Sequence, residues 1–301
     1  MTRRPMQKLT VKTPAKINWF LNIIGVREDG YHAIESLMQC VSLYDTLEFH
    51  HADALSVESG LAIPLGDNLV FRAASLLKKA GSYRSGATIR LKKKIPVGAG
   101  LGGGSSDAAC TLSSLNSLWD LGLTGKDLYA LASQIGSDVP FFLNGPAAFV
   151  EGRGEHITPL AMQSSVILLL AKPPHSVSTA WAYSSFDNVR GHEESTGPDK
   201  RGEKFELTKK AVDIKLFCQL LEGKDFTFLD RLIVNDLEAL VFERYPEIRE
   251  IRHRLKEMGA LVSSMSGSGS AVFGVFADRE KAKKAAGAMS PWWCEVVETL
   301  I

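Results

Sequence analysis

A glycine-rich stretch near residue 100 carries the strongest chemical signal in the sequence. It reads Pro-Val-Gly-Ala-Gly-Leu-Gly-Gly-Gly-Ser-Ser-Asp-Ala-Ala over residues 96–109, with five glycines within seven positions. Glycine costs backbone entropy, so such a cluster indicates a main chain that bends sharply or approaches another group closely. A helix is predicted over residues 108–118, and free N–H groups at a helix start attract anions. The stretch therefore predicts a phosphate-binding loop rather than a mobile linker.

Two familiar phosphate-loop patterns do not account for this stretch. Gly98, Gly100 and Gly103 match the dinucleotide fingerprint G-x-G-x-x-G, but the acidic residue downstream, Asp120, ends a predicted helix instead of a strand. The Walker pattern G-x-x-x-x-G-K-[ST] is absent, as are the H-R-D and D-F-G motifs of protein kinases and the zinc motif H-E-x-x-H. A NAD-binding oxidoreductase is therefore disfavoured.

Polar side chains interrupt two otherwise apolar segments. Lys16, Asn18 and Asn22 share one face of a strand predicted over residues 17–24. Asp138 lies at the start of a short predicted helix, among apolar neighbours. Each has an ordinary explanation, because the strand face can point to solvent and the aspartate can cap its helix. Each is also a candidate for acid–base or substrate-binding chemistry next to an anion site.

The elements that must position these residues are a mixture of helices and strands, typical of an α+β protein. The composition shifts near Leu160, so we expect two domains, residues 1–160 and 161–301. Residues 187–206 are polar and are expected to form an exposed or disordered loop. Strands are predicted over 9–11, 17–24, 37–41, 47–49, 88–91, 147–151, 155–158, 165–171, 260–264, 271–276 and 295–300. Helices are predicted over 68–79 (capped by Asp67), 108–118, 125–135, 178–186, 207–222, 235–244, 247–258 and 279–289.

Composition excludes several other classes of protein. A net charge of +1 over 301 residues argues against binding to nucleic acid through bulk electrostatics. The four cysteines are far apart and form no C-x-x-C pair, so we expect four buried thiols, with no metal site and no disulfide framework. The longest apolar run, residues 166–171, is too short to span a membrane. These features favour a cytoplasmic protein.

Three segments together resemble the motifs of a known family. Residues 14–18 (Pro-Ala-Lys-Ile-Asn), 96–109 and 266–273 are similar, in order and spacing, to the three motifs of the GHMP kinases, which are named after the galactose, homoserine, mevalonate and phosphomevalonate kinases. The resemblance covers nearly the whole chain. It implies a two-domain α+β architecture, with an N-terminal nucleotide-binding β-α-β domain, a ferredoxin-like C-terminal domain and the site between them.

The resemblance also implies an ATP site and a catalytic pair. In this family the glycine loop wraps the triphosphate of ATP, which is used with Mg²⁺. Asp138 resembles the catalytic base, and Lys16 resembles the partner that keeps it ionised and orients it. No residue of the chain can be assigned as a ligand of the metal. The ATP-binding residues expected on this basis are Pro96, Val97, Gly98, Ala99, Gly100, Leu101, Gly102, Gly103, Gly104, Ser105 and Ser106.

Gly-Tyr-His at 30–32, with the segments 102–109 and 136–142, narrows the resemblance to family members that act on a cytidine diphosphate-linked methylerythritol. There Tyr31 is expected to stack on the cytosine and His32 to read its edge. Tyr183 resembles the aromatic on the other side of the base, although Trp181 is an alternative. Asn18 is expected to hydrogen-bond the polyol, and Thr179, Gly267 and Ser268 complete the expected substrate-binding set.

The expected activity is ATP-dependent phosphorylation of the 2-hydroxyl of that substrate, in isoprenoid precursor biosynthesis. The alternatives are a kinase acting on homoserine or mevalonate, whose substrates carry no base to stack, and a non-catalytic nucleotide-binding regulator. The presence of both Lys16 and Asp138 disfavours the regulator. The expected partners are a small-molecule substrate only, without nucleic acid or membrane, and the chain is expected to be a monomer or a weak homodimer.

Overall fold

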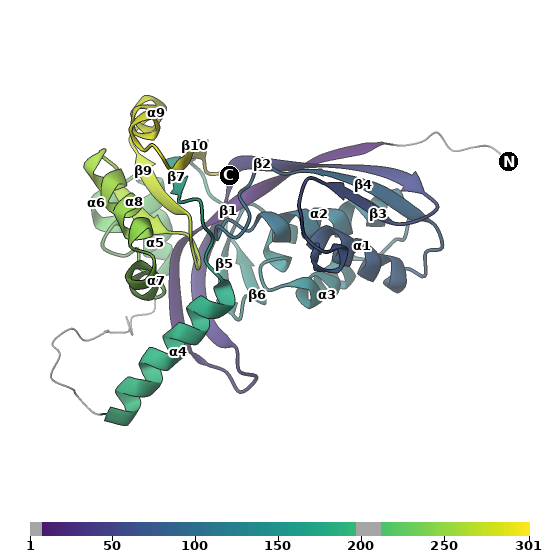
Figure 1. Ribbon diagram of the computed structural model, residues 1–301, viewed down its shortest axis with the longest axis horizontal. Coiled ribbons are helices and arrows are strands. Elements are labelled where there is room, and N and C mark those ends of the chain that lie inside the picture. The colour runs from purple at the N-terminus through teal and green to yellow at the C-terminus, as the bar shows by residue number, and fades with distance from the viewer. Residues whose placement is uncertain (1–7, 197–211) are drawn as a thin grey trace.

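Two β-sheets organise the molecule in the computed structural model, which describes residues 8–196 and 212–301 (Figure 1). Within these residues, strands β1 to β6 form the first sheet and strands β7 to β10 form the second. The sheet membership changes between β6 (His156–Pro159) and β7 (Ile167–Lys172). The basic N-terminal residues 1–7 lie outside the described residues.

The centre of the first sheet is a long strand, β2 (His32–Ala52). Strand β1 (Leu9–Val26) pairs antiparallel with β2 along the whole length of β1. Strands β5 (Ala147–Gly152) and β4 (Gly86–Lys92) pair antiparallel with the first and second halves of β2. The sequence predicts two short strands in place of each of β1 and β2, and this is wrong. Register shifts along β1, the first between Pro14 and Ala15, let the strand continue through the proline.

Three helices cover one face of the first sheet (Figure 1). They are α1 (Leu69–Ala80), α2 (Gly103–Leu118) and α3 (Gly125–Ile135), and their buried side chains form one apolar cluster with the strands. Strand β3 (Ser56–Ser59), which the sequence analysis missed, runs parallel to β4 with α1 between them. This connection is the β-α-β unit expected in the N-terminal part.

Two helix starts differ from the predictions. The side chain that caps α1 is Asn68, which accepts from the Val70 N–H, whereas Asp67 ends a 3₁₀ helix, η1 (Leu65–Asp67). Helix α2 begins at Gly103 instead of residue 108, because packing against the sheet overrides the low helix propensity of glycine and serine. The helix predicted over 125–135 is confirmed as α3, and a capping box starts it, since Thr124 and Asp127 bond reciprocally.

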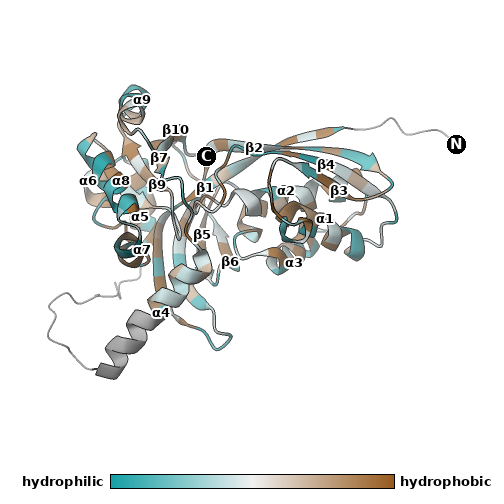
Figure 2. Ribbon diagram, in the orientation of Figure 1, coloured by the Kyte–Doolittle hydropathy of each residue, from teal (hydrophilic) through white to brown (hydrophobic). Residues whose placement is uncertain are grey.

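The second sheet has the strand order β10-β7-β9-β8, with all neighbours antiparallel. Its strands are β7, β8 (Val262–Met265), β9 (Val272–Phe276) and β10 (Trp293–Glu298), with α8 (Pro246–Glu257) before β8 and α9 (Arg279–Ala288) before β10. This β-α-β-β-α-β succession, in the spatial order 4-1-3-2, confirms the ferredoxin-like C-terminal part. Figure 2 shows α8 as mostly hydrophilic, because only the stripe of Ile248, Ile251 and Leu255 is buried.

Further helices separate β7 from β8. Helix α4 (Thr179–Thr196) continues well past the end predicted at residue 186, so the expected loop is wrong for residues 187–196, and residues 197–206 lie outside the described residues. Helix α5 (Ile214–Glu222) begins at an Asp213 cap, and the earlier part of the helix predicted over 207–222 is largely outside the description. Helices α6 (Phe226–Leu229), which was not predicted, and α7 (Glu238–Arg244) also lie between β7 and β8. The 3₁₀ helix η2 (Pro140–Leu143) lies earlier in the chain, between α3 and β5.

Two apolar clusters contain strands of both sheets, and Trp19 lies in the first of them. Trp19 of β1 meets Phe217 of α5 and Phe273 of β9, with ring centroids 6.5 and 5.5 Å away. Of the four free cysteines, Cys40 is buried, whereas those on α2, α5 and β10 are only partly buried, so the expectation of four buried thiols is wrong for three. Within residues 8–196 and 212–301, no helix combines the length and apolar character needed to cross a membrane.

Candidate active site

A cavity of about 450 Å³ lies where the glycine loop, strand β1, the start of α4 and the β8–β9 loop meet. Most of the predicted site residues line it, although they come from segments up to 250 residues apart. Tyr31, His32 and Ser106 do not line it. The predicted residues that do are Lys16, Asn18, Pro96, Val97, Gly98, Ala99, Gly100, Leu101, Gly102, Gly103, Gly104, Ser105, Asp138, Thr179, Tyr183, Gly267 and Ser268.

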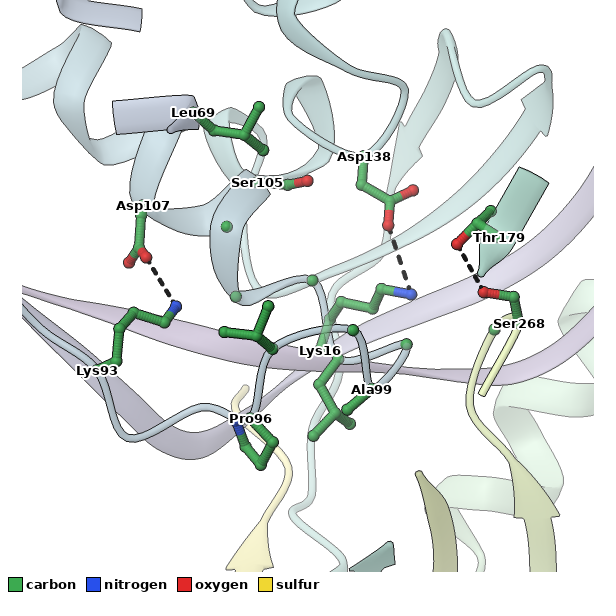
Figure 3. A pocket seen from close by; sticks show the side chains of 18 of the residues that line it. Lys16, Leu69, Lys93, Pro96, Ala99, Ser105, Asp107, Asp138, Thr179 and Ser268 are labelled. Carbon is green, nitrogen blue, oxygen red and sulfur yellow. Dashed lines mark hydrogen bonds and ion pairs between the residues drawn. The ribbon is translucent and has the colours of Figure 1, made fainter. Parts of the chain in front are cut away.

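Lys16 and Asp138 form an ion pair in this cavity (Figure 3). The Lys16 Nζ lies 3.5 Å from the Asp138 Oδ2, and the lysine side chain is only 4% exposed while the aspartate is 34% exposed. A lysine this buried requires a carboxylate or hydrogen-bond acceptors nearby. The more exposed Asp138 can therefore meet a ligand hydroxyl while Lys16 holds it from behind.

Asn18 orients Lys16 and is itself held on both sides. Its Oδ1 accepts from the Lys16 Nζ at 2.5 Å, and its Nδ2 donates to the Ser36 Oγ at 2.8 Å. The solvent-facing explanation of Lys16 and Asn18 is wrong, because both are nearly fully buried. Their amide and ammonium groups form a connected polar network below the cavity.

A β-bulge changes which side of β1 faces the cavity. The register of β1 against β2 shifts between Asn18 and Phe20, so one extra residue is inserted there. Beyond the bulge Leu21 lines the cavity, and Asn22 does not. The prediction that Asn22 shares a face with Lys16 and Asn18 is therefore wrong, because simple alternation along a strand fails at a bulge.

The glycine loop has a backbone that other residues would strain. Gly98, Gly100 and Gly102 all have positive φ, at 63°, 74° and 68°. Gly102 is the N-cap of α2 and provides no side-chain cap, and the first bond of that helix runs from the Ser106 N–H to the Gly102 carbonyl. The amides of the first turn before Ser106 therefore have no intrahelical acceptor, which suits an anion.

The β8–β9 loop fits against the glycine loop without a gap. A Cβ on Gly100 would lie 2.1 Å from the Ser266 carbonyl oxygen. The Ser266 Oγ donates to the Gly100 carbonyl at 3.1 Å and accepts from the Asn18 N–H at 3.2 Å. The Asn235 amide stabilises the β8–β9 loop by donating to the Met265 and Gly267 carbonyls. The three sequence motifs thus share one hydrogen-bonded framework.

Helix α4 closes the side of the cavity opposite the glycine loop. Its first residue, Thr179, shares a 2.8 Å hydrogen bond with Ser268, as Figure 3 shows, and Tyr183 lines the cavity one turn later. Burial, and to a lesser degree the Asp138 carboxylate, raises the pKa of Tyr183. Tyr183 is therefore a neutral phenol close to the ion pair.

Comparison with known proteins points to one family. The model described as GHMP kinases N terminal domain matches residues 68–146, and that described as GHMP kinases C terminal matches residues 213–292. A protein of Thermodesulfovibrio yellowstonii named 4-diphosphocytidyl-2-C-methyl-D-erythritol kinase is 44% identical, with 97% of this chain and 98% of the relative covered. The chain belongs to the GHMP kinase family. A relative of the same name from Pelotomaculum thermopropionicum is 43% identical to this GHMP kinase, with 92% of each covered.

Solved structures agree with this assignment. A crystal structure of 4-(cytidine 5'-diphospho)-2C-methyl-D-erythritol kinase is similar to this GHMP kinase with a TM-score of 0.79 and 34% identity, and covers 97% of this chain and 99% of that one. A homoserine kinase of Cytophaga hutchinsonii shares the fold, with a TM-score of 0.70 at 18% identity over 100% of this chain and 97% of that one. The predicted family, its two-domain α+β architecture and its class of small-molecule kinase are confirmed.

Of the residues predicted to hold a base, Tyr183 lines the cavity of this GHMP kinase, whereas Tyr31, His32 and Trp181 do not. His32 packs on Tyr183 with ring centroids 4.9 Å apart, although the two residues are 151 positions apart in the chain. Tyr31 is 53% exposed, with the Arg153 guanidinium 5.1 Å from its ring centroid. Trp181 lies instead against Tyr245, away from the cavity. The geometry thus favours Tyr183 over Trp181 as the second aromatic.

Sequence reasoning missed a buried charge cluster at the start of α2, of which Lys93 and Asp107 line the cavity. Asp107 accepts from the Lys93 Nζ at 2.9 Å (Figure 3). It also accepts from the Thr13 hydroxyl at 2.7 Å, and Lys93 also bonds Asp45. Asp45 in turn accepts from the Lys94 and Ile95 N–H groups. The sequence signal was present, because Lys93 belongs to the basic run that leads into the loop and Asp107 to the loop motif itself.

Burial raises the pKa of Asp107 to about 6, which the Lys93 ammonium opposes and the Asp45 carboxylate reinforces. Asp107 lies on the first turns of α2 and Asp45 on β2, so the cluster fixes the position of the helix that carries the anion site. Ser106, which was predicted to bind ATP, is 2% exposed and does not line the cavity, because it is already in the first turn of α2, which starts at Gly103.

The residues present fit a nucleotide better than a resident metal ion. One end of the cavity is apolar, lined by Leu61, Ile63 and Leu69, as a planar base requires, and the glycine loop follows it. Among the described residues, no group of three or more His, Cys, Asp or Glu side chains is arranged to hold a metal ion. Magnesium that accompanies a nucleotide takes many of its ligands from phosphates and water, so it requires no such cluster.

Proposed function

We propose that this GHMP kinase transfers the γ-phosphate of ATP to the 2-hydroxyl of 4-diphosphocytidyl-2-C-methyl-D-erythritol. The products are the corresponding 2-phosphate and ADP, and the reaction belongs to isoprenoid precursor biosynthesis. One observation carries the proposal: a single cavity is lined by the glycine loop, by the Lys16–Asp138 pair and by Tyr183, which packs on His32. Relatives that carry this substrate in their names, at 39–44% identity over at least 92% of this chain, support it.

The triphosphate of ATP would bind at the glycine loop. The first-turn amides of α2 point to the cavity from a glycine N-cap, and the positive end of the helix dipole adds to their attraction. The Ser105 hydroxyl lines the same wall and adds a donor. The adenine ring would take the apolar end beside Leu61, Ile63 and Leu69. Ser105 and Asp138, which line the same cavity, would hold Mg²⁺ together with the phosphates, and the bound ion would neutralise phosphate charge.

Asp138 and Lys16 would prepare the acceptor hydroxyl. The Asp138 carboxylate accepts the hydroxyl proton as the oxygen attacks, and its ion pair with Lys16 fixes its orientation. A loose phosphoryl-transfer transition state needs little proton removal early, so the main contribution of this pair is alignment of the hydroxyl with the γ-phosphate. Lys16 also places a positive charge where negative charge is spread over the transferring group.

The cytidine end would bind beside α4 and the β1–β2 hairpin. Tyr183 and the exposed Tyr31 offer aromatic faces, and His32 offers a ring nitrogen to the edge of the base. Thr179, Gly267 and Ser268 line the wall between this end and the ion pair, where the polyol would lie. Asn18 was predicted to hydrogen-bond the polyol. Its amide already bonds Lys16 and Ser36, so a hydrogen bond to the polyol would be additional to these two.

The deciding experiment is a coupled ADP-release assay with three acceptors. The cytidyl substrate, homoserine and mevalonate are compared at equal concentration with ATP and Mg²⁺. We expect turnover only with the cytidyl substrate, because neither rival carries a base for Tyr183 and His32. Preferential turnover of homoserine or mevalonate would establish the corresponding rival kinase. ATP binding without turnover of any acceptor would support the nucleotide-binding regulator.

A further inference from the structure

Helix α4 presents three side chains to the site at intervals of four residues. Thr179 bonds Ser268 at 2.8 Å, Tyr183 packs on His32, and the Asp187 Oδ1 lies 2.7 Å from the His32 Nε2. Residues at i, i+4 and i+8 lie along the same side of a helix, so the three contacts belong to one face. The sequence analysis assigned Asp187 to an exposed loop, and the continuation of α4 places it at the base-binding end instead.

His32 is held by α4 from several directions. Its side chain is 8% exposed, the Tyr183 ring lies against it at an angle of 40°, and Phe186 meets it edge-on at 6.1 Å. The Asp187 side chain is 45% exposed, so it stays hydrated while it bonds the imidazole. Packing thus fixes the plane of the ring, and Asp187 fixes which nitrogen carries the proton.

The position of that proton decides what the ring can recognise. A neutral imidazole that donates its Nε2–H to a carboxylate carries its lone pair on Nδ1, where it can only accept a hydrogen bond. Cytosine offers a donor there, its exocyclic amine, whereas uracil has an acceptor oxygen at the same position. A ring locked in this tautomer is therefore complementary to cytosine and repels uracil.

We propose that Asp187 is a positioning residue that holds His32 in the tautomer which selects cytosine over uracil in the substrate. The inference rests on the proposed function, since it specifies how the same site distinguishes its base. A purely structural role, in which Asp187 only anchors α4, predicts a general loss of stability or activity without a change in base preference.

The activity test compares the cytidyl substrate with its uridine diphosphate counterpart. Wild type, Asp187→Asn and Asp187→Ala are assayed side by side at pH 8. The amide in Asp187→Asn can also donate to Nε2, which permits the tautomer that donates from Nδ1 to uracil. We expect the ratio of kcat/KM values for the two acceptors to fall by about tenfold or more in this variant, with the KM for ATP unchanged.

Two control variants separate this effect from damage to the helix or loss of charge. Ser184→Ala changes an exposed residue of α4 that bonds only the Ala180 carbonyl of its own helix, among the contacts of the described residues. Glu28→Gln removes one negative charge from the exposed hairpin turn. Both are expected to keep the wild-type ratio. Melting temperatures of all variants are measured in parallel.

A spectroscopic measurement tests the tautomer without any substrate. The ring ¹⁵N shifts of His32, assigned by their disappearance in His32→Gln, should show a protonated Nε2 and an unprotonated Nδ1 in the wild type, and a mixture in Asp187→Ala. A protonated Nδ1 in the wild type overturns the inference.

The two proposals fail in different ways. If wild type phosphorylates the cytidyl substrate and both Asp187 variants keep its base preference, the inference alone is overturned. If wild type phosphorylates neither the cytidyl nor the uridyl compound, the proposed function is overturned, and the selectivity inferred from it falls as well.

Discussion

The ion pair of Lys16 and Asp138 shows how a few atoms set the chemistry of this kinase. Lys16 is almost fully buried and has two oxygen partners, Asn18 Oδ1 at 2.5 Å and Asp138 Oδ2 at 3.5 Å. The shorter contact anchors the ammonium, which leaves the longer one free to adjust when a substrate hydroxyl enters. At the residue scale the site is therefore a buried, hydrogen-bonded lysine that supports a more exposed carboxylate.

Asp138→Asn tests the role of that carboxylate. The amide is nearly the same size but cannot accept a proton, so we expect kcat to fall by about 10²–10⁴-fold. The dissociation constant of ATP should stay within about twofold of wild type, because the glycine loop is untouched. Steady-state kinetics and calorimetric ATP binding measure the two quantities. Asp120→Asn, at an exposed position beyond α2, is the matched control, and a near wild-type kcat in Asp138→Asn would show that the base is elsewhere.

Asp107 makes the stability of the protein depend on pH. Its pKa is raised to about 6 in the folded state from an ordinary value of 3.8. Between these values the folded state holds a proton that the unfolded chain has lost, so stability is higher at pH 4 and falls as the pH rises through 6. Asp107→Asn cannot titrate and should lack this decline.

We therefore expect the free energy of unfolding of wild type to fall by roughly 2–3 kcal/mol more than that of Asp107→Asn between pH 4 and pH 6.5. Urea unfolding at half-unit pH steps measures both curves, and only their difference is used, since other titrating groups are common to both proteins. Parallel curves would contradict the raised pKa.

The glycine loop and the β8–β9 loop work as a pair of elements. The Ala271 N–H donates to the Ala99 carbonyl at 3.0 Å, and the Lys16 N–H donates to the Leu101 carbonyl at 2.9 Å. The carbonyls of the loop are thus used on the protein side, while the amides at the start of α2 remain for a ligand. This division, which the alternating positive φ values of the glycines make possible, converts a flexible sequence into an ordered anion site.

Gly100→Ala tests that fit. Its Cβ would lie 2.1 Å from the Ser266 carbonyl oxygen, so the two loops must separate, and we expect kcat/KM for ATP to fall by about 10²-fold. Gly122→Ala is the matched control, because Gly122 has a similar φ of 66° with no atom within 4 Å of the added Cβ. Both variants should lose about 1 kcal/mol of unfolding free energy, because alanine is strained at a positive φ. Only Gly100→Ala should also lose ATP affinity. Equal kinetics in the two would contradict the close packing.

The whole molecule is held together by a core shared between its two sheets. Phe217 of α5 is fully buried against Trp19 and Phe20 of β1, and the same cluster includes Phe273 and Val275 of β9. The cavity lies above this junction, with the glycine loop from one sheet unit and the β8–β9 loop from the other. The relative position of the two units is therefore part of the site geometry.

Phe217→Ala should lower the unfolding free energy of both sheets together. Removal of this ring from the shared core is expected to cost about 3–5 kcal/mol of unfolding free energy, whereas the neighbouring Leu216→Ala, at a 38% exposed position, should change it by no more than about 0.5 kcal/mol. Guanidinium unfolding is followed by far-UV circular dichroism and by tryptophan fluorescence. Coincident transitions are expected, and two separated transitions would show that the sheets unfold independently.

The sequence by itself determined the chemistry of this protein and the family to which it belongs. Glycine spacing indicates an anion site, because residue type limits which backbones can cradle an anion. Phosphoryl transfer, with Lys16 and Asp138 as the catalytic pair, is what the resemblance of the three motifs to the GHMP kinases implies. Local signals also placed helix α3 and the β5–β6 hairpin, since a capping box and a glycine turn act over a few residues.

Only the tertiary structure decided which of these residues meet. The bulge after Asn18 turns Leu21 toward the cavity, the early start of α2 turns Ser106 away, and the continuation of α4 brings Asp187 to His32 across 155 residues. Each outcome depends on packing between segments distant in the chain, whose free energy exceeds the local preference of any one of them. Residue types therefore predicted the reaction, and long-range packing fixed the geometry in which it can occur.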